Sequence, residues 1–157
     1  QPWYTDIGST CKNIAQEFAK HNRVLYINTP LNRNAMRKKD DPLLQGHLKI
    51  IKDKKQDLIE IQSNLWNYYP SCILESINWI PSTKIFSLLN KINNRRFAKS
   101  IRQAISKLGF KDYILFNDND IFRSFYLKEL LQPSMYIYLY RDYILGADYW
   151  KKHGNTL

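Results

Sequence analysis

The stretch "GSTCKNIAQEFAKHNRVLYINTP", residues 8–30, decides the fold, because a turn, a helix and a buried strand follow one another directly. Ser9 or Thr10 can cap the helix, since both side chains accept hydrogen bonds from N–H groups of a first helical turn. Apolar residues then recur at the spacing of one buried helix face: Cys11, Ile14, Ala15, Phe18 and Ala19. "RVLYIN" is short and apolar, which is typical of a strand buried in a parallel sheet.

The composition is that of an ordinary globular domain. The chain has 157 residues, 44% hydrophobic and 24% charged, and no apolar run approaches the ~20 residues of a membrane span. Cys11 and Cys72 are too few for a disulfide framework or a zinc site, and the composition suits the reducing cytoplasm. The histidines (His21, His47 and His153) lack metal-ligand spacing, so we expect no metal.

The net charge of +10 is the extreme feature, and it favours a polyanionic partner. Residues 76–111 contain no Asp or Glu. Arg95, Lys99 and Arg102 lie on one face of a predicted helix, where they could bind an anionic membrane surface or simply keep the protein in solution. A nucleic-acid-binding module is a second hypothesis, but the sequence lacks a ribonucleoprotein motif, a zinc finger and a clear helix-turn-helix. A scaffold or interaction domain is the third.

The rest of the chain continues the alternation of helices and strands. In the first half we expect a surface loop over 31–47, strand-like pieces at 48–51, 58–61 and 65–69, and a loop or short helix over 71–81. A helix should begin at Ser82, break at Asn93-Asn94 and resume as far as Gly109. The last part should hold a strand at 112–116, a helix over 121–131 and a strand at 135–140. This order predicts an α/β domain with a mostly parallel sheet whose central strands are 24–27, 113–116 and 135–140.

The turn at Gly8 and Ser9 suggests a ligand site. In a doubly wound sheet, ligands bind outside the carboxyl ends of the strands, often at the first strand-to-helix turn. The strand that leads into such a turn would lie before residue 1, so we expect this chain to be part of a longer domain.

The pattern "PW.TDIGS..KNIA.EFAK.NRVLYIN.PL.R", residues 2–33, resembles the N-terminal half of bacterial glycosyltransferases with two Rossmann-like domains, the GT-B architecture. It is most similar to the group-one, family-four-like enzymes of polysaccharide synthesis. "YILF" and "MYIYLYRDY" match the same half. The resemblance implies a Rossmann-like three-layer domain that binds a sugar or lipid-linked glycan acceptor at the cytoplasmic face of the membrane. It also implies a C-terminal donor domain that holds the nucleotide-sugar, no further cofactor, and an inactive fragment when residues 1–157 stand alone.

Several side chains at the expected cleft are candidates for substrate binding. Gly8 and Ser9 could present backbone donors to negative charge, or merely form a turn and a cap. Asp6 could orient an acceptor hydroxyl or be an ordinary turn carboxylate. Asn117 and Asp118 follow a predicted strand, where they could contact the acceptor.

Three further residues near these strand ends have competing interpretations. Asn119 or Asp120 could cap the next helix, while "DND" weakly matches a metal-binding pattern of the other glycosyltransferase fold. Asp142 is the candidate catalytic residue, as the base of an inverting enzyme or an acceptor-positioning group in a retaining one. The alternative for Asp142 is a salt bridge with Arg141.

Overall fold

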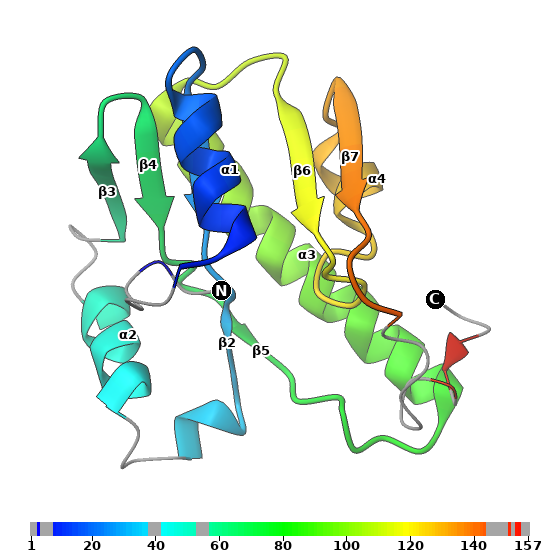
Figure 1. The fold of residues 1–157 in the computed structure, drawn as a ribbon. Coiled ribbons are helices and arrows are strands. Elements are labelled where there is room, and N and C mark those ends of the chain that lie inside the picture. The colour runs from blue at the N-terminus through cyan, green and yellow to red at the C-terminus, as the bar shows by residue number, and fades with distance from the viewer. Residues whose placement is uncertain are drawn as a thin grey trace.

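The computed structural model describes residues 3, 8–37, 42–52, 57–143, 151, 153 and 154, and these form a mixed α/β structure (Figure 1). The helices are α1 (Thr10–Ala19), α2 (Pro42–Lys52), α3 (Thr83–Leu108) and α4 (Leu127–Leu131), with a 3-10 turn η1 (Ala35–Arg37). The strands are β1 (Val24–Ile27), β2 (Leu31–Asn32), β3 (Leu58–Gln62), β4 (Leu65–Tyr68), β5 (Ile73–Leu74), β6 (Ile114–Asp118) and β7 (Met135–Leu139).

The described strands form three small sheets rather than one. In the first, of order β1-β4-β3, β1 is parallel to β4 and β3 is antiparallel to β4. The short strands β2 and β5 pair in parallel, and β6 pairs in parallel with β7 from Ile114–Met135 to Asp118–Leu139. The strands at 24–27, 114–118 and 135–139 are therefore confirmed as strands, but hydrogen bonds do not join the first to the other two.

Helix α1 forms as the sequence predicts. Ser9 is its N-cap, and the Ser9 side chain accepts a hydrogen bond from the Lys12 N–H. Ala15 and Ala19 are buried against Tyr26 of β1 and Leu65 of β4, so the small residues of the helix face let it approach the sheet closely. Figure 1 shows α1 on one side of the strands and α3 on the other.

Helix α3 is continuous over 26 residues, so the predicted break at Asn93-Asn94 is wrong. Both asparagines are buried, and their side chains bond to neighbouring segments instead of interrupting the helix. Asn94 Nδ2 donates to the Phe122 carbonyl at 2.9 Å, and Asn94 Oδ1 accepts from the Tyr126 N–H at 2.9 Å. The stop at Gly109 is confirmed, because this residue has φ 63° and ends the helix in the left-handed conformation.

The predictions for the middle of the chain were partly wrong. Residues 31–47 hold β2, η1 and the start of α2, and the piece at 48–51 is helical rather than a strand. Leu44, His47 and Ile51 follow helical spacing, which outweighs the local apolar run. Within 121–131 only α4 is helical, and within 71–81 a two-residue strand forms.

At the amino ends of β1 and β4, Arg23 joins the sheet to the end of α3. Its guanidinium carbon lies 5.1 Å from the ring centre of Trp66 and 4.8 Å from that of Phe110. Its Nη2 also donates to the Leu108 carbonyl at 2.7 Å. We call this arrangement the Arg23 clamp, and cation–π attraction and a charge-assisted hydrogen bond both stabilise it.

Candidate ligand-binding site at the carboxyl ends of the strands

A chain of polar side chains runs from the start of α1 to β1. Ser9 Oγ lies 3.1 Å from Cys11 Sγ, which in turn lies 3.2 Å from the Tyr26 hydroxyl. Ser9 also satisfies two N–H groups of the first turn, those of Lys12 and Asn13. Among the described residues, the N–H groups of Thr10 and Cys11 gain no such partner, so the positive end of the helix dipole is available to an anion or a hydroxyl.

A second group lies where β6 and β7 end. Arg141 Nη2 donates to Asp118 Oδ2 at 2.9 Å, and Nε lies 2.9 Å from Oδ1. The second contact is an ion pair by distance but lacks hydrogen-bond alignment, since Oδ1 is buried without a hydrogen-bond partner among the described residues. Arg141 therefore holds the Asp118 carboxylate in place and leaves one oxygen able to accept a hydrogen bond.

Tyr26 connects the two groups. Burial, the hydrogen bond with Cys11 and the negative charge of Asp118 raise the pKa of Tyr26, while the charge of Arg141 lowers it. Helix α1 packs on β1, and its Phe18 ring lies 6.3 Å from the Phe116 ring of β6, so the helix contacts both sheets although the two sheets are not hydrogen-bonded to each other. The tyrosine hydroxyl keeps its proton at neutral pH and can act as a hydrogen-bond donor.

The loop after β6 is organised by its own side chains. Asn117 is buried, and its amide nitrogen lies 2.8 Å from both Ser124 Oγ and the Tyr136 hydroxyl, while its oxygen accepts from the Asp120 N–H. Asp120 Oδ1 accepts from the N–H groups of Phe122 and Arg123, but it closes a turn there rather than capping the predicted helix, because α4 begins only at Leu127. Asn119 adopts φ 55° and accepts from the Tyr138 hydroxyl. This network fixes the loop that carries Asp118.

The other predicted residues are placed differently. Asp6 lies outside the described residues. Gly8 is exposed, and a side chain added there would meet no atom within 4 Å, so the turn does not need glycine for space. Asp142 is also exposed, and the partner that the sequence offered it, Arg141, binds Asp118 instead. The structure places Ser9 in the first group and Asp118 in the second, and adds Cys11, Tyr26 and Arg141, which sequence reasoning missed.

Asn28 was also missed. It follows β1 directly and is buried, and its Nδ2 donates to Asn67 Oδ1 at 2.6 Å and to the Tyr68 carbonyl at 2.9 Å. Its oxygen accepts from the Trp3 N–H at 2.8 Å. The signal was available, because Asn28 and Asn117 both occur at the carboxyl end of a parallel strand.

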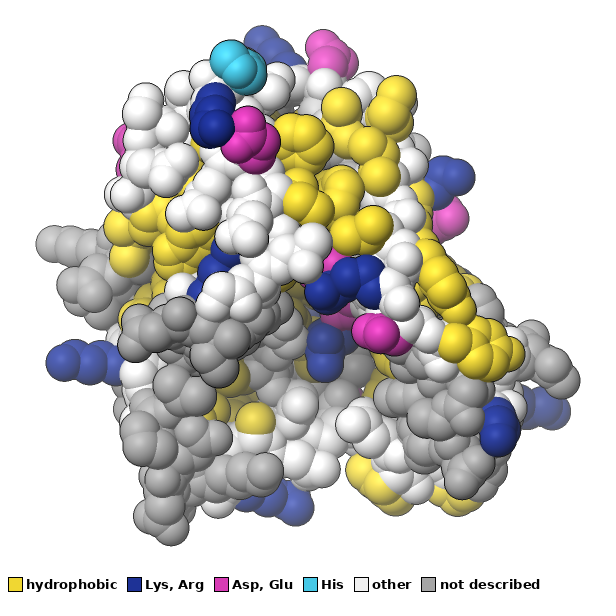
Figure 2. Space-filling view, in the orientation of Figure 1, with side chains coloured by type: hydrophobic (Ala, Val, Ile, Leu, Met, Phe, Trp, Pro, Cys, Tyr) yellow, Lys and Arg dark blue, Asp and Glu magenta, His cyan; other side chains and the backbone are white. Residues whose placement is uncertain are grey.

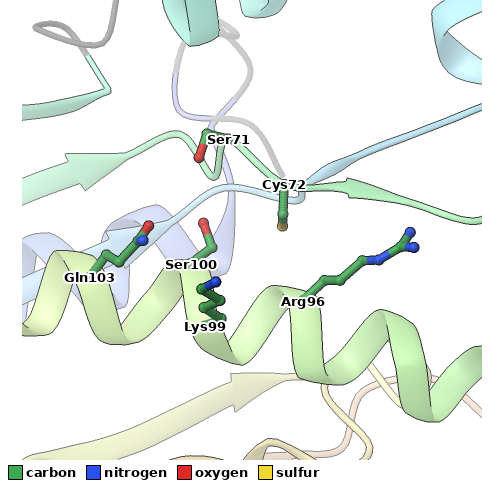
Figure 3. A pocket seen from close by; sticks show the side chains of 6 residues that line it. All are labelled: Ser71, Cys72, Arg96, Lys99, Ser100 and Gln103. Atoms are coloured by element: carbon green, nitrogen blue, oxygen red, sulfur yellow. The ribbon is translucent and has the colours of Figure 1, made fainter.

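A basic pocket lies on the α3 side of the molecule (Figure 3). It has a volume of about 200 Å³ and is lined by Ser71, Cys72, Arg96, Lys99, Ser100 and Gln103. Of the three predicted anion-binding cations, Lys99 lines this pocket, whereas Arg102 bonds to the Leu130 carbonyl. Arg96 already forms a 2.7 Å ion pair with Glu75, and the negative charge of Glu75 weakens the electrostatic attraction between this pocket and an anion. Burial raises the pKa of the Cys72 thiol to about 11, so this thiol lines the pocket as an uncharged group and is not a nucleophile at neutral pH.

No group of three or more His, Cys, Asp or Glu residues within the described ranges is arranged to hold a metal ion. In the same part of the chain, each helix is too short or too polar to cross a membrane. Comparisons with protein-family models, curated proteins and solved structures found no match for this chain.

Proposed function

We propose that the chain is the acceptor-side domain of a glycosyltransferase that transfers a sugar from a nucleotide-sugar to a glycan or lipid-linked acceptor. The observation that carries the proposal is the presence of two polar groups at the carboxyl ends of the strands: the Ser9–Cys11–Tyr26 chain at the α1 N-terminus and the Asp118–Arg141 pair after β6. A Rossmann-like arrangement of the whole domain, in which these strands share one layer, belongs to the same proposal.

The chemistry of the site suits a hydroxyl-rich, phosphorylated acceptor. Asp118 Oδ1 has no hydrogen-bond partner among the described residues and can accept from a sugar hydroxyl, while the Tyr26 hydroxyl of the first group can donate. The first N–H groups of α1 and the half-exposed guanidinium of Arg141 favour a phosphate or pyrophosphate nearby. In this proposal Asp118 takes the acceptor-positioning role that the sequence assigned to Asp142.

The start of α3 supports a peripheral encounter with a membrane that carries the acceptor. Three large apolar side chains are exposed there or in the turn just before it: Trp79 at 71%, Ile85 at 53% and Leu88 at 61%. Exposed cations, including Arg95 and Lys99, follow them along the same helix. Apolar residues that dip into the interface, next to cations that face anionic headgroups, are the usual composition of a reversible membrane-binding surface.

The second candidate function is polyanion binding without catalysis. It rests on the same cations of α3 and on the net charge of +10. It needs neither the Asp118–Arg141 pair nor the α1 N-terminus, so the two functions predict different binding surfaces.

Amide and side-chain NMR of the 157-residue chain tests the proposal. The probes are methyl glycosides, hexose 1-phosphates, a short polyprenyl-phosphate sugar and a DNA oligonucleotide. We expect the sugar probes to shift the signals of Thr10, Cys11, Tyr26 and Arg141, and Asp118→Asn to remove those shifts. Shifts confined to α3, and produced by DNA alone, would establish the second function instead.

A further inference from the structure

Among the described strands, the edges of β1 and β6 that lie away from their partner strands are open. The Val24 and Asn28 N–H groups bond to carbonyls of Asn64 and Tyr68, on the β4 side. Since alternate residues of a strand direct their backbone groups to the same edge, Leu25 and Ile27 direct theirs away from β4. The Ser134 N–H bonds to the Tyr113 carbonyl, so by the same alternation Ile114 and Phe116 direct theirs away from β7.

The same two helices cover both open edges. On one side, α1 packs on β1 through Ala15 and Ala19, and its Phe18 ring lies 6.3 Å from the Phe116 ring of β6. On the other side, Ile27 of β1 and Leu115 of β6 both pack against the apolar cluster of α3 and α4. The open edges of β1 and β6 therefore lie between the same two helices, as the neighbours of one further β-strand would.

The surroundings are apolar, as a buried strand requires. Phe18 is 47% exposed and Ile114 is 57% exposed, although both lie beside the packed core. Apolar side chains gather over β6 and β7 in the space-filling view (Figure 2). Isolated exposed apolar residues are ordinary, but a contiguous group beside unpaired backbone groups indicates a surface that a partner covers.

We propose that an extended, mainly apolar polypeptide segment inserts between β1 and β6 and pairs in parallel with both. Its N–H and C=O groups would bond to Leu25 and Ile27 on one edge and to Ile114 and Phe116 on the other. The β1-β4-β3 and β6-β7 sheets then become one continuous sheet. Because β1 and β6 both run toward the α1 N-terminus, the carboxyl end of the segment lies beside Tyr26 and Asp118. This proposal depends only on the open edges of β1 and β6, and not on which ligand the candidate site binds.

The outer edges of β3 and β7 are the competing places for such a segment. They are also open among the described strands, but neither edge is faced by a second one. A segment bound there would form one ladder instead of two. Protection of individual amides from hydrogen exchange distinguishes these positions.

The experiment joins a Val/Ile-rich segment of about seven residues, followed by a Gly-Ser linker, to residue 1. The control segment has Pro at alternate positions and cannot donate to both edges. We expect the amides of Leu25, Ile27, Ile114 and Phe116 to gain about tenfold or greater protection, while those of Tyr26 and Leu115 serve as references that are already bonded.

The same segment added as a free peptide to the folded 157-residue chain provides a second measurement if the fusion does not fold. Selective protection of those four amides again supports insertion between β1 and β6. Protection at the outer edges of β3 or β7, a uniform gain over all amides, no gain at all, or an equal gain with the Pro segment would overturn the proposal.

Discussion

The side chain of Asn93 in α3 is bonded in both directions to the backbone of Glu75. Asn93 Nδ2 donates to the Glu75 carbonyl at 2.9 Å, and Asn93 Oδ1 accepts from the Glu75 N–H at 2.7 Å. The Glu75 carboxylate meanwhile pairs with Arg33 and Arg96, so one residue joins three segments. Buried amide pairs of this kind hold irregular backbone where a ladder cannot.

Asn93→Ala should lower the free energy of unfolding by about 2–3 kcal/mol, because it leaves two backbone groups of Glu75 without their partners. Urea unfolding measures the effect. Gln103→Ala, at an exposed position of the same helix, is the control and should cost less than about 0.5 kcal/mol. Equal losses for the two variants would mean that the Asn93–Glu75 contact contributes nothing.

Asp118→Asn should weaken binding of a sugar-phosphate probe by about tenfold or more, because the amide loses the charge held by Arg141 and half of the acceptor capacity. Asp142→Asn is the matched control, since Asp142 is exposed and should change affinity by less than about twofold. Titration calorimetry with hexose 1-phosphate measures both. A larger effect at Asp142 would return the acceptor-positioning role to that residue.

His47 should make the fold weaker as the pH falls. Burial lowers the pKa of His47 from its ordinary 6.5, its ring packs on Tyr69, and its Nε2 is buried without a hydrogen-bond partner in the described structure. The unfolded chain therefore binds a proton first, so stability is complete above pH 6.5 and declines as the pH falls toward the lowered value. Urea unfolding between pH 7 and 5 should show this slope, and His47→Phe should reduce it.

The exposed His21 is the control residue for that measurement, through the variant His21→Gln. A slope that survives His47→Phe in full would assign the pH dependence to other groups.

Cys72 should react with iodoacetamide about 100-fold more slowly in the native chain than in urea at pH 8, because its pKa rises from 9.0 to about 11 and the thiolate is the nucleophile. Peptide mapping by mass spectrometry follows Cys72 separately from Cys11. Equal rates in the folded and unfolded chain would show that the pocket leaves the thiol ionisable.

The apolar residues at the start of α3 should contribute to vesicle binding. We expect co-sedimentation with anionic vesicles at low salt, a loss at high salt as the charges are screened, and weaker binding for Trp79→Ser and Leu88→Ser. Ile59→Ser, at a 38% exposed apolar position of β3, is the control and should bind normally. Equal binding to neutral and anionic vesicles would remove the cations of α3 from the interaction.

The parts of the fold that local chemistry determines could be predicted from sequence. The cap at Ser9, the left-handed stop at Gly109 and the strands 24–27 and 114–118 depend on a few neighbouring residues. The continuity of α3 at Asn93 and Asn94 could not, because the partners of these amides lie in distant segments. Asparagine is a weak helix former only while its side chain has no better partner elsewhere.

The candidate site shows the same division. The positions of Ser9 and Asp118 follow from the rule that ligands bind at the carboxyl ends of strands. Two other features depend on how separate strands pack. Cys11 contacts Tyr26, and Arg141 forms its ion pair with Asp118 rather than with Asp142. No periodicity in the sequence carries that information.

The Arg23 clamp gives the two ends of the strands different tolerance to change. At the amino ends, one guanidinium contacts two aromatic rings and the last turn of α3, so a substitution of Arg23 removes three contacts at once. At the carboxyl ends, the loops after β1 and β6 supply the polar groups without carrying that packing. Under the proposed function, substitutions in those loops can therefore change ligand preference while the Arg23 clamp keeps its packing.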